Sequence, residues 1–157
     1  MIRLIAFLLI TLALSPAHAA PETFKLDPSA SDVAFTYTLQ GNATEGSMPV
    51  SAATLTVDLS NISKSEVDVT LAANKARAGL IFATEAMMSK SVLNTKEHPT
   101  IRFQATKITG TLNRAEMEGN LTIRGVTRPV TLQGQVLRQA GTPATERDRL
   151  AIRLTGA

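Results

Sequence analysis

The chain has 157 residues, a formal net charge of +3 and no cysteine. Without cysteine it contains neither a disulfide nor a thiolate that could act as a nucleophile or a metal ligand. The stability of the fold must therefore come from apolar burial and from the hydrogen bonds of regular secondary structure.

The first residues have the pattern of a secretory signal peptide. Arg3 supplies a positive charge, an apolar run occupies residues 4–14, and Ala17-His18-Ala19 is a small-residue cleavage site. The apolar run is too short to span a bilayer. We expect residues 1–19 to be a signal peptide cleaved near Ala19, and residues 20–157 to form one periplasmic domain large enough for its own core.

Alternation of apolar and polar residues predicts strands over most of the remaining chain. The alternating runs cover residues 33–39, 54–59, 66–71, 101–106, 117–124, 130–136 and 150–155. A period of two places the apolar side chains on one face of a strand and the polar side chains on the other. The expected fold is therefore all-β and antiparallel, with one wet face, although periodicity alone does not distinguish a sandwich from a barrel.

One segment between the predicted strands departs from this alternation. Apolar residues between positions 77 and 93 do not alternate, and we expect a short helix around 84–88 with Thr84 as its N-cap. Phe82 and the methionines of this segment leave two roles open, because methionine adapts to irregular surfaces. The helix is either a lid over the mouth of a barrel or a plug in one of its ends.

The chain offers few of the groups that enzymes use. After the signal peptide the only histidine is His98, which precedes Pro99 in an expected surface turn. No residue at a recognisable spacing would orient it as a general base. One histidine and scattered carboxylates do not form a metal-ligand set either. We therefore expect a protein that is not an enzyme and that has no metal or other cofactor.

Basic residues are concentrated in the second half of the chain. Residues 20–99 have six Lys and Arg against nine Asp and Glu, whereas residues 100–157 have nine against four. Two interpretations stand: transient contact with an anionic membrane surface, or arginines that only solvate the outer faces of strands. The export signal and the lack of a basic and aromatic cluster argue against a nucleic-acid partner.

Three stretches of the sequence resemble the YceI-like family of exported bacterial proteins. Residues 24–35 are similar to the family's opening "aromatic-x-Leu-Asp-Pro-x-x-Ser-x-Val-x-Phe", and residues 98–103 contain its "Pro-x-Ile-x-Phe". Residues 119–130 resemble its "Gly-x-Leu-Thr-Ile-x-Gly-Val-Thr-x-Pro-Val". The three motifs occur in the family's order and span nearly all of the predicted domain.

The resemblance implies a lipocalin-like antiparallel barrel of about eight strands that binds a polyisoprenoid lipid, such as a polyprenyl chain or a quinone tail, in the periplasm. The inward apolar residues of such a barrel would line its cavity. They are Val33, Phe35, Tyr37, Leu55, Val57, Val67, Val69, Leu71, Phe82, Met87, Ile101, Phe103, Leu121, Ile123, Val130 and Leu132. Composition alone also allows a filled core, which would suit a stress-related interaction domain that carries no lipid. Neither interpretation predicts the oligomeric state.

The sequence differs from the family pattern at three places. Ala30 stands where the family often has histidine, and Gly46-Ser47-Met48 stands where it has Gly-x-Phe. After Ala157 the family continues through an Arg-x-x-Phe-Gly turn into a final strand. We therefore expect the last strand of the barrel to be missing here, which would leave one seam of the sheet open.

Overall fold

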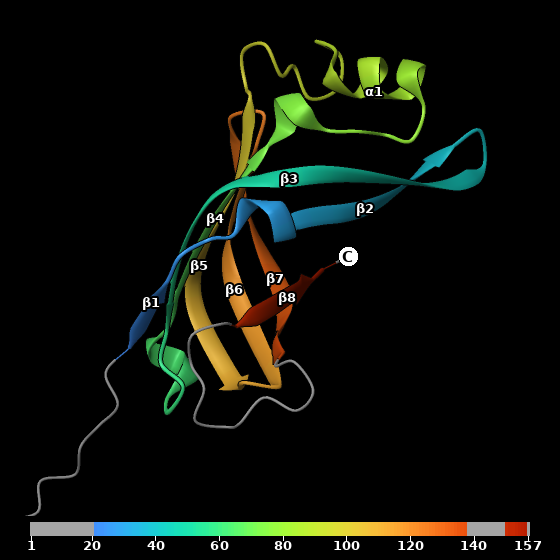
Figure 1. Cartoon of the computed structure of the whole chain (residues 1–157). Coiled ribbons are helices and arrows are strands. Elements are labelled where there is room, and N and C mark those ends of the chain that lie inside the picture. The colour runs from blue at the N-terminus through green and yellow to red at the C-terminus, as the bar shows by residue number, and fades with distance from the viewer. Residues whose placement is uncertain (1–20, 138–149, 157) are drawn as a thin grey trace, which may run out of the picture.

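The computed structural model describes residues 21–137 and 150–156, which form eight strands and one α-helix (Figure 1). The signal peptide predicted for residues 1–19 lies outside the described residues and remains a prediction. The strands are β1 (Glu22–Phe24), β2 (Asp32–Leu39), β3 (Asn42–Val57), β4 (Glu66–Ala72), β5 (Thr100–Thr111), β6 (Arg114–Ile123), β7 (Val126–Leu137) and β8 (Ala151–Thr155). The helix α1 spans Ile81–Met88, and 3-10 turns cover Pro28–Ala30, Ile62–Lys64 and Ala73–Lys75.

Strand β3 has two different partners on the two halves of its length. Residues 42–49 pair with β2, while residues 50–56 pair with β4, and the short strand β1 pairs with its last residues. A register shift between Val50 and Ala52 lies where the partner changes, as expected of a bulge that bends a strand. Strands β2 and the first half of β3 therefore leave the main sheet as a two-stranded wing (Figure 1).

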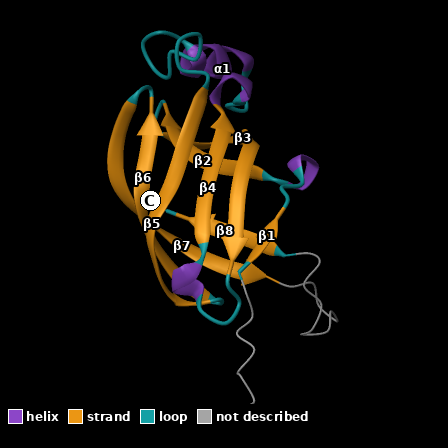
Figure 2. Cartoon of the chain, turned by 90° about the vertical axis from the view of Figure 1, so that its left-hand side faces the viewer, coloured by secondary structure: helices purple, strands orange, loops and turns teal. Residues whose placement is uncertain are grey.

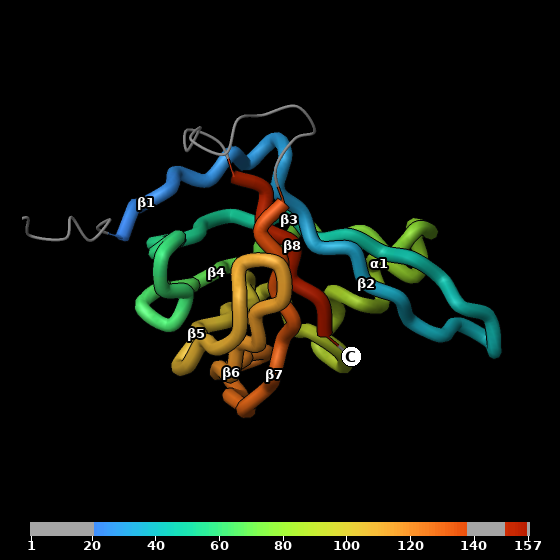
Figure 3. Tube along the Cα trace, turned by 90° about the horizontal axis from the view of Figure 1, so that it is seen from below, coloured from blue at the N-terminus to red at the C-terminus, as the bar shows by residue number. Residues whose placement is uncertain are grey.

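The remaining strands form a curled antiparallel sheet. Their order is β1-β3-β4-β5-β6-β7-β8, so that every strand after β3 pairs with the next strand in sequence. Viewed from below, the sheet bends round so that its first and last strands approach the same side (Figure 3). In the described part of the chain no pairing joins β8 to β1 or β2, and the fold is a half-barrel rather than a closed one.

The all-β antiparallel fold predicted from the alternation is confirmed, but the expectation of a missing last strand is wrong. An eighth strand is present, because Ala151–Thr155 pairs with residues 133–137 of β7. Its short alternating run supplies enough backbone and apolar side chains to add to the sheet. The open seam expected from a missing strand is therefore found beyond β8 instead.

The helix lies inside the predicted segment 77–93, but Thr84 is not its N-cap. The helix begins earlier, at Ile81, and Thr84 is in its interior. The Thr84 hydroxyl donates to the Leu80 carbonyl oxygen at 2.9 Å and accepts from the Ala78 N–H at 2.9 Å. Because it satisfies backbone groups that precede the helix, the helix can start one turn before it. No helix in the described ranges is long and apolar enough to cross a membrane.

Two apolar clusters form the core on the concave side of the sheet. The sheet cluster consists of Val67, Phe103, Ile108, Ala115 and Met117. The helix cluster consists of Met48, Ala73, Ala76 and Ile101, which lie nearer α1. Leu121 on β6 packs against both clusters, so the two are continuous.

Glycines on the concave face allow large side chains of neighbouring strands to fold over them. A Cβ at Gly119 would lie 2.5 Å from the Gln104 carbonyl oxygen and 2.7 Å from the Phe103 ring. The Phe35 ring covers Gly46 in the same way, directly across the β2–β3 ladder. A ring packed over a glycine protects the backbone while it lets the sheet curve tightly.

We predict that Gly119→Ala destabilises the fold by about 1–3 kcal/mol, because the backbone of β5 cannot move away from the new methyl group. The matched substitution is Gly134→Ala, whose Cβ would meet the flexible end of Met117, Cε, at 2.5 Å. Since Met117 can change rotamer, this variant should lose less than about 1 kcal/mol. Urea denaturation measures both, and equal losses would contradict the role given to the Gly119 contact.

Candidate functional site

The concave face of the curled sheet is a continuous apolar surface. The ladders place Val69 of β4, Phe103 of β5 and Leu121 of β6 in one row across the sheet. Leu71 and Ile101 form part of the next row toward α1. Because paired residues of antiparallel strands share a face, these rows all point into the curl.

The wing supplies a second apolar wall. In β2 the residues Val33, Phe35, Tyr37 and Leu39 are half-buried, and the residues between them are exposed. The Phe35 and Tyr37 ring centroids are 6.2 Å apart, and Phe35 packs against the helix cluster. The inner face of the wing therefore looks toward the concave face of the sheet, and its side chains are only partly covered.

The segment that leads into α1 is held against the wing by backbone hydrogen bonds. Ser47 and Arg77 exchange two N–H to carbonyl bonds of 2.8 Å each. The Tyr37 hydroxyl donates to the carbonyl oxygen of Ala78, which is itself fully buried. From this anchor the helix runs across one end of the concave face, with Met87 packed on the helix cluster (Figure 2).

Eleven of the sixteen residues predicted to line a cavity belong to the two clusters or pack against them. They are Phe35, Leu55, Val67, Val69, Leu71, Met87, Ile101, Phe103, Leu121, Val130 and Leu132. Val33 and Tyr37 are half-buried on the wing, as described above. Val57 is buried beyond the sheet cluster, at the end of the sheet remote from α1.

Phe82 and Ile123 pack against neither cluster, and their predicted place in a cavity lining stays a prediction. Phe82 is 60% exposed and Ile123 is 37% exposed. Met87 occupies the inner side of α1, and Phe82 lies about 140° away around the helix axis. Ile123 is the last residue of β6, two positions after Leu121 and so on the same face of the strand, and it pairs with Val126 beside the β6–β7 turn.

Several core residues were absent from the predicted lining. Met48, Ile108 and Met117 are buried, and the alternation around Met117 was the signal that could have identified it. Ala73 and Ala76 are also buried in the helix cluster. Alanine gives no such signal, because it is common on both faces of strands and in loops.

The two ends of the concave surface are packed differently. At the end remote from α1, an apolar pocket between Val57, Ile108 and Met117 has a volume of about 10 Å³, room for about one water molecule. Near α1 two of the four buried residues of the helix cluster are alanines, and the facing side chains of β2 are half-buried. No large side chain in the described ranges is fully buried. The concave surface is therefore filled at one end and partly accessible at the other.

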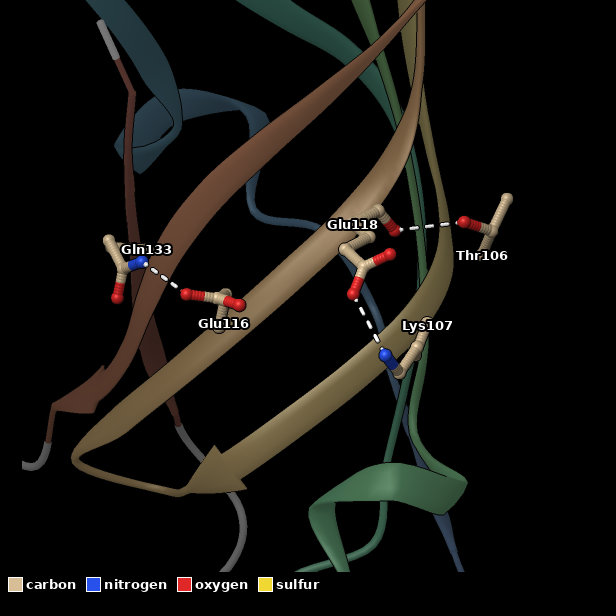
Figure 4. A network of polar contacts seen from close by, with 5 residues as sticks. All are labelled: Thr106, Lys107, Glu116, Glu118 and Gln133. Carbon is tan, nitrogen blue, oxygen red and sulfur yellow. Dashed lines mark hydrogen bonds and ion pairs between the residues drawn. The ribbon is translucent and has the colours of Figure 1, made fainter.

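Polar side chains of β5, β6 and β7 contact one another on the convex face of the sheet (Figure 4). Lys107 Nζ forms an ion pair with Glu118 Oε1 at 2.9 Å, and Gln133 Nε2 donates to Glu116 Oε2 at 3.3 Å. The hydrogen bond from Lys107 to Glu118 raises the pKa of Lys107. These carboxylates face solvent and bind neighbouring strands, so the convex face serves solubility and strand pairing.

The described residues contain no group of three or more His, Asp and Glu side chains that could hold a metal ion. The half-buried ring of His98 lies against the β6–β7 turn, where a Cβ on Gly125 would be 3.2 Å from its Cε1. The predictions about catalysis and cofactors stay predictions. The chemistry that the arrangement does offer is apolar contact within a curved wall.

Comparison with known proteins identifies the family. A sequence profile of the YceI-like domain matches residues 24–155. The chain is 33% identical over 88 residues to a UPF0312 protein of Pseudomonas paraeruginosa. The aligned residues cover 56% of this chain and 46% of that protein. It is 26% identical over 144 residues to the protein YceI of Salmonella newport, covering 90% of this chain and 75% of that protein. The chain spans less than half the length of the Pseudomonas relative.

Solved structures show the same fold. The structure of BcnA from Burkholderia cenocepacia superposes with a TM-score of 0.65 at 20% identity, over 73% of this chain and 72% of that one. The YceI protein of Campylobacter jejuni superposes with a TM-score of 0.59 at 22% identity, over 81% and 73% of the two chains. Both are all-β neighbours of the half-barrel described above. The chain belongs to the YceI-like domain family.

The ion pair between Asp68 and Arg102 on the convex face should make stability depend on pH. Hydrogen bonding from Arg102 is the main cause that lowers the pKa of Asp68, while partial burial opposes it. A folded-state pKa below the unfolded value of about 3.9 means that the stabilisation is present at neutral pH. It is lost as the pH falls through the folded pKa.

We predict that Asp68→Asn lowers the melting temperature at neutral pH and that the difference from wild type shrinks on acidification below about pH 4. Arg102→Gln should give the same pattern, because it removes the partner. Thermal unfolding followed by circular dichroism across this pH range measures both. A difference from wild type that stays constant with pH would show that the ion pair is not its source.

Proposed function

We propose that this protein binds a long apolar lipid of the isoprenoid type, such as a polyprenyl chain or a quinone tail, between the wing and the curled sheet. The observation that carries the proposal is the pair of facing apolar walls whose side chains are only half-buried near α1. Apolar surface left partly exposed in a concave site is typical of a ligand-binding groove. A ligand tail would complete the burial of both walls.

The energetics favour such a ligand. Burial of one CH₂ group contributes about 0.8 kcal/mol, so a few isoprene units contribute on the order of 10 kcal/mol before losses. Ordering the flexible tail offsets much of this gain, which leaves an affinity in the micromolar to nanomolar range as the expected order. Apolar contact discriminates by length and girth, so the site should accept several related tails.

Small side chains near α1 make this end of the groove the better place for the tail. Ala73, Ala76 and Ala78 are buried there, whereas the far end is filled by Ile108 and Met117. A tail that enters beside α1 would therefore lie along β2 and the rows of Leu71 and Ile101. The tight packing at the far end also favours a second candidate, an interaction domain that carries no lipid and whose core is filled.

We also propose that the protein acts in the periplasm. Two observations support this proposal: the signal-peptide pattern of residues 1–19, and membership of the YceI-like family of exported bacterial proteins. A carrier in this compartment would keep an insoluble tail out of water between membranes. The absence of cysteine suits a fold that does not depend on oxidation there.

The direct prediction is that the purified protein contains an isoprenoid lipid. Organic extraction of the protein from its native host, followed by mass spectrometry, should release a polyprenyl or quinone species in a stoichiometric amount. After delipidation, the protein should bind radiolabelled farnesol delivered from cyclodextrin. A protein that is bare when purified and also binds no added isoprenoid would leave the interaction domain as the better account.

A pair of adjacent substitutions on β2 tests where the lipid lies. Val33 faces the groove and packs in neither cluster, whereas Ala34 faces solvent. Val33→Arg should weaken isoprenoid binding by more than about tenfold, because it places a charged group in the apolar groove. Ala34→Arg adds the same charge on the other face and should change the affinity less than about twofold.

Equilibrium binding of radiolabelled farnesol measures both affinities, and far-UV circular dichroism checks that both variants fold. Equal affinities for the two variants would place the ligand away from the wing. Phe103 is a poorer choice for this test, because it is 6% exposed at the centre of the sheet cluster and its substitution would disturb the fold.

A further inference from the structure

Exposed apolar side chains gather at one end of the molecule. Of the seven large apolar side chains that are exposed in the described ranges, six lie in α1, in its flanking segments and in the β6–β7 hairpin. They are Leu80, Ile81, Phe82, Val92, Ile123 and Val126. These segments share the upper end of the molecule in two perpendicular views (Figures 1 and 2). We call these six residues the apolar end.

The helix at this end is apolar on more sides than the protein itself covers. Ala83 is buried and Met87 packs on the helix cluster, yet Ile81 is 83% exposed. The hydroxyl of Thr84 is hydrogen-bonded to backbone groups that precede the helix. Glu85 is the only charged side chain of the helix. A surface helix normally presents a polar outer face, so an apolar outer face indicates a non-aqueous neighbour.

Basic side chains occur in and next to the segments that carry the apolar end, and none of them forms an ion pair with another described residue. Residues 75–98 and 123–128 contain six Lys and Arg and two Asp and Glu. Their basic residues are Lys75, Lys90, Lys96, Arg77, Arg124 and Arg128, and all of them are exposed. The two ion pairs found within the described residues, Asp68–Arg102 and Lys107–Glu118, lie elsewhere on the sheet. The other described residues hold six basic and nine acidic side chains, so the positive excess is confined to this end.

We infer that the apolar end docks on the headgroup region of an anionic lipid bilayer. Apolar side chains that enter the interface, flanked by cations that attract anionic headgroups, are the two contributions that hold a protein on such a surface. This inference rests on the proposed function, because the groove is accessible at the same end. Docking there would let a lipid tail pass between bilayer and groove without crossing water.

The charge pattern selects a bilayer over a second copy of the chain. A symmetric contact between two copies would place the same patch on both sides of the interface. Six unpaired cations would then face six others, which opposes association. An anionic bilayer instead presents the opposite charge next to an apolar layer, and so matches both features of the apolar end.

Co-sedimentation of the full chain with vesicles tests the docking. The wild type should bind vesicles of phosphatidylcholine with phosphatidylglycerol, more weakly in high salt, and should bind pure phosphatidylcholine much less. Ile81→Asp should reduce the partition coefficient by about tenfold, since it removes an apolar anchor and adds a repelled charge. An acidic residue suits the first position of a helix, so this change should leave α1 folded.

The matched control is Leu137→Asp, which adds the same charge at the seventh exposed apolar residue. Leu137 is 36% exposed and ends β7 at the opposite end of the molecule (Figure 1). This control should bind vesicles within about twofold of wild type. Equal loss in both variants, or no binding of the wild type to anionic vesicles, would overturn the docking.

Farnesol delivered from cyclodextrin separates this inference from the proposed function. Ile81→Asp should bind soluble farnesol as wild type does, because its side chain lies outside the groove. Farnesol binding without vesicle binding would refute the docking and retain the lipid site. Vesicle binding without farnesol binding would refute the lipid site, and docking would then stand only as a surface property of the apolar end.

Discussion

The bend of strand β3 is the constraint on which the rest of the fold depends. One continuous strand of 16 residues pairs with β2 along its first half and with β4 along its second half. If β3 stayed straight, β2 would lie in the plane of the sheet as an ordinary hairpin strand. Because β3 bends at Val50–Ala52, β2 instead faces the sheet, with the apolar side chains of its inner face half-buried.

That bend also decides where small residues are needed. The wing can approach the segment before α1 only because Gly46 has no side chain, since a Cβ there would lie 2.7 Å from the Arg77 carbonyl oxygen. The Ser47–Arg77 bonds and the buried Ala76 and Ala78 belong to the same close contact. The wing, the helix and the groove are therefore fixed by one set of backbone contacts rather than by large interlocking side chains.

The sequence predicted the faces of strands better than their length or their environment. Alternation in 33–39 and 117–124 correctly assigned Phe35 and Leu121 to the inner face, because the period of a strand is local. It missed residues 42–53 of β3, where Pro49, Ala52 and Ala53 interrupt the apolar pattern. It also could not foresee the exposure of Phe82, because no local pattern says which side of an eight-residue helix will meet the rest of the protein.

The half-buried apolar wall of β2 and the exposed apolar end have a common physical origin. A fully closed barrel with a solid core would cover its apolar side chains and would have no reason to leave Ile81 in water. A protein that takes up a tail must keep part of its inner wall uncovered, at least while the site is empty. Aggregation is then the hazard, and the unpaired cations beside the apolar end oppose it through repulsion between copies. The same cations would attract an anionic surface, so one arrangement of charge would serve both the separation of copies and the docking inferred above.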